Sequence, residues 1–224
     1  MTRSHLSFQL AILISTLLLS TATVAQDRHF PLNHRQPTGT AGRWAVATHP
    51  QRFGYYQPVK IQLPSAGHVT FFQGNSQNAV LTQAPAQAGM VVGHTYRVRV
   101  SGMPEFPGVE LFPTIEILDR LHPPAEHAHE FPIPIEITAD EIEVVRQDRM
   151  VTKVVYLEQP DLAAPVEEGD RIRIEDLAVS RNLLKAADQR GRPMAIIRIG
   201  GRLPDPNSEL DVFYSQSPIV IPQQ

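Results

Sequence analysis

Apolar and polar residues alternate over much of this chain, most regularly in its middle third. In residues 109–117 the apolar side chains occupy odd positions, whereas Glu110 and Glu116 occupy even ones. In residues 131–138 a phenylalanine and three isoleucines share one face. A period of two is typical of strands that bury one face. The pattern therefore predicts two strands here, and a third, more central one over Val151–Leu157, which is apolar on both faces.

Two prolines place the second of these strands at the edge of its sheet. Pro132 and Pro134 are two residues apart, so their missing N–H groups would lie on the same side of the strand. That side cannot donate hydrogen bonds to a neighbour at these positions. We therefore expect residues 131–138 to form an edge strand, where the prolines also oppose pairing with another molecule.

A short helix is expected directly after this strand. Thr138 to Glu141 has the sequence of a capping box, in which the Thr138 hydroxyl accepts from the Glu141 N–H and the Glu141 carboxylate accepts from the Thr138 N–H. The helix should run for two or three turns and end near residues 148–150. Ile142 and Val145 are three residues apart and can face the sheet together.

Further strands are predicted on both sides of this stretch. Arg97 or Arg99, on the most regular of them, should face Glu110 or Glu116 as solvent-exposed charge pairs. The expected strands are 59–63 and 69–72, joined as a hairpin, a weaker one in 78–83, then 95–100, 171–175, 194–199 and 211–220, with a helix over 183–189.

These elements predict a mainly β protein. We expect an antiparallel immunoglobulin-like β-sandwich over residues 57–160, with the capped helix in a connection, and residues 161–224 as a C-terminal extension of the sheet or a small α/β subdomain. The alternative is an α+β domain in which the capped helix crosses over to a parallel neighbouring strand. The 20 prolines agree with many turns and extended connections.

The N-terminus has the pattern of a secretory signal peptide. Arg3 precedes an apolar run over 10–19, and small residues follow up to Ala25. We expect residues 1–25 to be removed after Ala25, with Ala22 as the alternative, and a retained anchor as the competing interpretation. No later segment is apolar enough to span a bilayer. The chain has no cysteine, which excludes disulfides and thiolate catalysis.

Residues 26–56 lack the apolar periodicity of a packed element and predict an extended N-terminal arm. Trp44 is expected to dock this arm onto the core, the alternative being a surface role in binding a sugar ring or a partner. With 20 Lys and Arg against 23 Asp and Glu, the chain lacks the strong field of a protein that binds nucleic acid.

Three blocks of sequence resemble secreted bacterial proteins of unknown function: ELFPTIEILDR at 110–120, VVYLE at 154–158 and GRPMAIIRIGG at 191–201. The resemblance covers roughly residues 96–202. It implies export, and no activity, cofactor or catalytic residue.

The residues with ligand chemistry gather in the loop His122–Glu130. Imidazoles of His127 and His129 are candidates to bind Zn or Cu, with His122, Glu126 or Glu130 completing the site. His68 or His94 could be recruited from elsewhere in the fold. The alternative is a solvated loop tip between two strands.

No motif of a nucleophile elbow, phosphate-binding loop, zinc protease or dinucleotide site is present. We therefore expect an exported, non-catalytic binding or structural module whose partner is an unknown protein or polysaccharide of the cell envelope. Two alternatives stay open: a periplasmic metal-binding protein, and a carbohydrate hydrolase. The hydrolase needs a cleft with two carboxylates, and the sequence selects no pair among Glu110, Glu116, Asp119 and Glu136.

Overall fold

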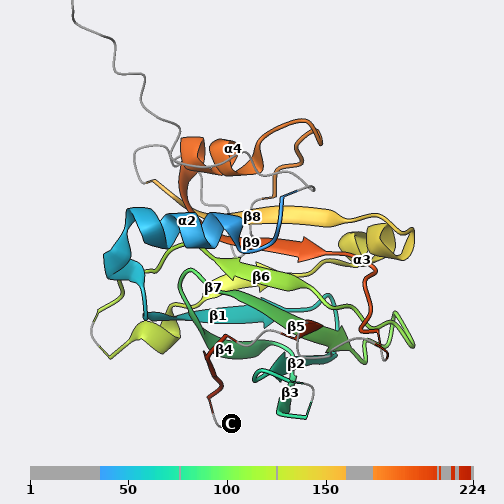
Figure 1. The fold of residues 1–224 in the computed structure, drawn as a ribbon. Coiled ribbons are helices and arrows are strands. Elements are labelled where there is room, and N and C mark those ends of the chain that lie inside the picture. Colours follow the sequence, from blue (N-terminus) through green and yellow to red (C-terminus); the bar gives the residue numbers. More distant parts are fainter. Residues whose placement is uncertain are drawn as a thin grey trace, which may run out of the picture.

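The computed structural model describes residues 36–75, 77–124, 126–159, 174–205, 207, 213–214 and 217–222. Within them the protein is mainly β: two sheets with three short α-helices (Figure 1). The predicted signal peptide and the predicted strand at 171–173 lie outside the described residues, as does most of 211–220. No helix in the described part of the chain is long and apolar enough to cross a membrane.

The smaller sheet is mixed. Its order is β10 (Ile219–Val220), β4 (Ala86–Val91), β1 (Tyr56–Gln62) and β7 (Ile133–Glu136), and the β1–β7 pair is parallel. The larger sheet is antiparallel throughout, in the order β3 (Ala79–Gln83), β2 (His68–Phe72), β5 (Thr95–Ser101), β6 (Thr114–Ile117), β9 (Gly191–Ile199) and β8 (Val151–Glu158).

One hydrophobic core joins the two sheets. Ile61 and Ile135 of the smaller sheet belong to the same buried cluster as Phe71, Val98 and Ile197 of the larger one. Alternate residues of each strand supply this cluster, as the period of two requires. The other face of the larger sheet is therefore its outer face, and it carries the polar members of β5 and β6.

The edge strand and the capping box are confirmed. Within the described residues β7 pairs only with β1, and Pro134 points to solvent. Helix α3 (Ala139–Arg146) follows, with the Glu141 N–H 3.2 Å from the Thr138 hydroxyl and the Thr138 N–H 3.0 Å from the Glu141 carboxylate. Ile142 and Val145 are buried in the core, as predicted.

The predicted central position of residues 151–157 is wrong, because β8 is the outermost strand of the larger sheet. Both faces of β8 are apolar because each face packs against another part of the protein. Val151 and Val155 face the main core, while Val154 packs with helix α4 (Leu183–Arg190). Helix α3 connects strands of two different sheets, β7 and β8, so it is not a crossover to a parallel neighbour in one sheet.

The predicted extended arm is also wrong where the structure describes it. Residues Thr40–Thr48 form helix α2, and a 3₁₀ turn, η1 (Pro50–Arg52), follows. The helix buries Ala41, Gly42 and Ala45, small residues that give no strong apolar periodicity in sequence. Trp44 is 39% exposed, so small residues rather than the indole ring anchor this segment.

The described C-terminal region extends the same sheet. Strand β9 lies between β6 and β8, and α4 packs over β8 and β9. Leu184 of α4 and Ala41 of α2 share a small cluster with Ile196 of β9. Both helices therefore cover the outer face of the larger sheet (Figure 1).

Candidate functional site

The predicted metal loop is on the surface. It contains a 3₁₀ turn, η2 (Ala128–Glu130), in which Glu130 Oε1 lies 2.8 Å from His127 Nδ1 and 3.8 Å from His129 Nε2. No group of three or more His, Asp or Glu side chains among the described residues is arranged to hold a metal ion. A site formed by His122, His127, His129 and Glu130 stays a prediction.

The four candidate carboxylates of a hydrolase lie in different surroundings. Glu110 is exposed, and the predicted exposed pair with Arg99 is present, 3.6 Å apart. Asp119 is buried, with its Oδ1 3.1 Å from Arg52 Nε and its Oδ2 3.5 Å from Arg192 Nε. These contacts tie η1 and β9 to the end of β6.

Glu116 departs from the prediction of an exposed pair, because it is fully buried. Its Oε2 lies 3.1 Å from Arg198 Nη1, and its Oε1 accepts a hydrogen bond of 2.6 Å from the Gly42 N–H. The carboxylate therefore fixes the first turn of α2 against the sheet. Alternation correctly assigned Glu116 to the outer face, but α2 covers that face at this point.

Two glycines allow α2 to pack closely against the turn between β4 and β5. A Cβ on Gly42 would lie 3.1 Å from the Gly93 carbonyl oxygen, and a Cβ on Gly93 would overlap Val46 of α2. Gly93 has φ +85°, a left-handed conformation that favours glycine. The helix is thus seated on the turn between β4 and β5, next to His94.

The C-terminal segment, of which residues 213–214 and 217–222 are described, covers a neighbouring part of the same face. Phe213 and Tyr214 form a cluster with Phe72 and Phe112. Strand β10 pairs with β4 at the other end of the segment. Between them the Tyr96 hydroxyl donates to the Pro218 carbonyl at 2.8 Å and accepts from the Val91 N–H at 2.6 Å. Burial raises the pKa of Tyr96, so its hydroxyl stays protonated.

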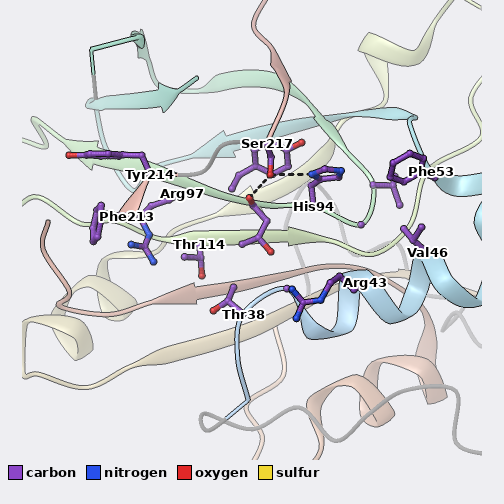
Figure 2. A pocket seen from close by; sticks show the side chains of 15 residues that line it. Thr38, Arg43, Val46, Phe53, His94, Arg97, Thr114, Phe213, Tyr214 and Ser217 are labelled. Atoms are coloured by element: carbon purple, nitrogen blue, oxygen red, sulfur yellow. Dashed lines mark hydrogen bonds between the residues drawn. The ribbon is translucent and has the colours of Figure 1, made fainter. Parts of the chain in front are cut away.

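A cavity of about 750 Å³ lies between α2 and this C-terminal segment (Figure 2). This volume is in the range of natural small-molecule sites. Its floor is the outer face of β5 and β6, where Thr95 and Arg97 lie beside Thr114. The walls include three aromatic rings, four hydroxyl groups and two arginines: Phe53, Tyr214, Phe213, Thr38, Thr95, Thr114, Ser217, Arg43 and Arg97.

Arg97 is a partly buried cation in the lining of this cavity. Its Cζ lies 4.0 Å from the centre of the Phe213 ring, and its Nε is buried without a hydrogen-bond partner among the described residues. Burial lowers the pKa of Arg97, and the nearby Arg202 lowers it further. The described lining contains no Asp or Glu, so the carboxylate pair of a glycoside hydrolase is not found there.

His94 and Ser217 contact each other at the edge of the cavity. His94 Nδ1 lies 3.2 Å from Ser217 Oγ, and that hydroxyl donates to the Thr95 carbonyl at 3.1 Å. Because the single hydroxyl proton points to Thr95, Nδ1 is the donor to Oγ in this arrangement. The contact links the turn before β5 to Ser217. Burial lowers the pKa of His94.

Sequence reasoning did not find this site. The sequence predicts His94 only as a distant ligand for the metal loop, and Arg97 only as an exposed partner of a glutamate. Nothing local distinguishes Arg97 from Arg99, since both lie on the polar face of the same strand. The signal that separates them is Phe213, which is more than a hundred residues away in sequence.

No protein-family model matches the chain, and comparison with curated proteins and with solved structures found no match. The function therefore has to be inferred from the chemistry of the cavity itself.

Proposed function

We propose that this protein is an exported, non-catalytic binding protein of the cell envelope, and that the cavity between α2 and the C-terminal segment is its binding site. The observation that carries the proposal is the cavity of about 750 Å³ with aromatic and hydroxyl walls. Mostly apolar walls with a few convergent polar groups are typical of binding sites. The ligand is a small molecule or the end group of a larger envelope component.

Two features favour binding over catalysis. The hydroxyl of Ser217 donates to the Thr95 carbonyl, so in this arrangement its proton is directed away from His94. The described lining also lacks a carboxylate that could act as acid or base. The two sheets with one shared core further support an immunoglobulin-like sandwich, an architecture common among extracellular binding domains.

Export is supported by the sequence pattern of residues 1–25. It is tested by fractionating cells that produce the full chain and measuring the mass of the intact protein in each fraction. We expect an envelope or external form that begins at Gln26, or at Thr23 with the alternative site. A cytoplasmic form with its first residues intact would contradict this part of the proposal.

Binding is tested by native mass spectrometry after incubation with envelope extracts of the producing cells. Thr38 is exposed and lines the cavity, so Thr38→Trp should block it without disturbing the core. Thr48→Trp, at the exposed last residue of α2 and outside the lining, is the matched control. We expect a bound mass with the wild type and the control and none with Thr38→Trp. Equal capture by all three proteins, or by none, would refute the cavity as the site.

The metal-binding alternative has one observation in its favour. The carboxylate of Glu130 lies near both His127 and His129, so the three side chains are within reach of a common ion after small rotations. Its test is independent of the cavity and is given below.

A further inference from the structure

We propose that the cavity binds an amphipathic anion, a carboxylate, sulfonate or phosphate group on an apolar or aromatic body, and that Arg97 holds the charged group. This inference rests on the proposed function, since it names the ligand class of the same site. Four observations carry it: the missing partner of Arg97, the charge around it, the aromatic walls and the hydroxyl groups beside it.

Arg97 differs from two other arginines on the same sheet, because each of those two has a carboxylate partner. Arg99, two residues along the same strand, lies 3.6 Å from Glu110, and Arg198 lies 3.1 Å from Glu116. Arg97 has no carboxylate partner among the described residues, and its Nε is both buried and without a hydrogen bond. A partly buried cation without a partner destabilises a fold unless another group supplies the negative charge.

The surroundings of Arg97 increase the local positive charge. Arg202 approaches the same Phe213 ring, with its Cζ 5.8 Å from the ring centre. Arg43, from the first half of α2, also lines the cavity. With no acidic side chain in the described lining, the field inside the cavity favours an anion.

The shape of the site suits a ligand with an apolar part. Phe213 covers one face of the Arg97 guanidinium, and Nε is buried, so the contact with a planar anion falls to the two Nη groups. Figure 2 shows Arg97 between Phe213 and Thr114, whose hydroxyl can donate to the same anion. Phe53 and Val46, at the other end of the cavity, offer an apolar surface for the rest of the ligand.

Two fluorescent probes with similar rings separate charge from apolar contact: anilinonaphthalene sulfonate, an anion, and N-phenyl-naphthylamine, which lacks the sulfonate. We expect the wild type to bind the anion about tenfold more tightly, because one charge-assisted contact is worth about that factor. Arg97→Met should remove about that tenfold preference and leave binding of the neutral probe unchanged. Arg97→Lys should keep part of the preference, because it keeps the charge and loses the bidentate geometry.

Arg99→Met is the matched control, since it removes a cation from the same face of the same strand outside the cavity. It should bind both probes as the wild type does. Because Arg97 has no carboxylate partner to lose, and methionine can still contact the Phe213 ring, Arg97→Met should unfold at the same temperature as the wild type or higher. If Arg97→Met does not fold, Arg43→Met, a change at an exposed position, is the test in its place. A loss of about threefold in affinity for the anion would then support the inference.

The outcomes separate this inference from the proposed function. Equal affinity for the two probes, or an anion preference that survives in Arg97→Met, would overturn the inference. If Thr38→Trp still blocks the neutral probe in that case, the cavity remains a binding site for uncharged ligands. If neither probe binds and no mass is captured from envelope extracts, both proposals fail.

Discussion

Glu116 and Glu110 offer a direct test of how burial changes the energy of an ion pair. Both are glutamates at even positions near β6, and each has an arginine partner. Glu116 is fully buried and the side chain of Arg198 is 10% exposed, whereas the side chain of Glu110 is 49% exposed. Neutralising Glu116 leaves the Arg198 cation inside the protein without its partner. Neutralising Glu110 leaves Arg99 in water.

The expected magnitudes follow from this difference. Removing one partner of a buried pair costs about 3 kcal/mol or more, while an exposed pair at 3.6 Å is worth roughly 0–1 kcal/mol. For a protein of this size 3 kcal/mol corresponds to roughly 6–12 °C in unfolding temperature. We expect Glu116→Gln to lower the unfolding temperature by about that amount and Glu110→Gln by about 4 °C or less. The glutamine can still accept the Gly42 N–H, so the change removes the charge and the acceptor of Arg198 but keeps the contact with α2.

The assay is thermal unfolding followed by circular dichroism, with urea unfolding to obtain the free energy. Glu116→Gln combined with Arg198→Met tests the cause, because the double variant removes both charges and should recover part of the lost stability. If Glu116→Gln and Glu110→Gln lower stability equally, burial does not raise the energetic cost of losing one partner of the pair, and the reasoning from burial is wrong.

Three further predictions test other parts of the structure. Gly93→Ala should destabilise the protein by about 1 kcal/mol from left-handed strain and by about 1–3 kcal/mol more from overlap with Val46. Gly108→Ala is the control, because at φ +75° with open space around it the change adds backbone strain without an overlap. If urea unfolding shows that Gly93→Ala and Gly108→Ala lose the same free energy of unfolding, α2 does not pack closely against Gly93. The lowered pKa of His94 favours its neutral form in the folded state, so the unfolded state takes up a proton first as the pH falls. Stability should therefore fall below about pH 6.5, and His94→Gln should show a smaller loss between about pH 7 and pH 5.5. If the loop His122–Glu130 binds metal, equilibrium dialysis against Zn and Cu should show binding that His127→Ala with His129→Ala abolishes, and indifference to the double change would remove that hypothesis.

Local features of the fold were predictable from sequence. Period-two alternation gave β1, β5 and β9, and Pro132 with Pro134 correctly placed β7 at an edge. The capping box also started α3 where expected, at Thr138. These features depend on neighbours within a few residues, so their physical causes are visible in a short window of sequence.

The helix α2 shows where such reasoning fails. Its buried side consists of Ala41, Gly42 and Ala45, which bury little apolar area and produce no strong periodic signal. The helix is held instead by the hydrogen bond from Gly42 to Glu116, which is 74 residues away. A contact at that separation cannot be inferred from the residues that flank either partner.

By itself, the sequence determined which side chains alternate, where an edge strand lies and where a helix begins, because hydrophobic period and backbone hydrogen-bonding capacity are local properties. Only the tertiary structure decided that Glu116 is buried and Glu110 exposed, and that Arg97 faces a cavity while Arg99 faces a carboxylate. The physical reason is that the sequence of a strand determines whether its outer face is polar or apolar. Whether that face is exposed to solvent depends on which other segments pack over it. Here the covering groups come from α2 and from Ser217, which contacts Thr95 across 122 residues of chain.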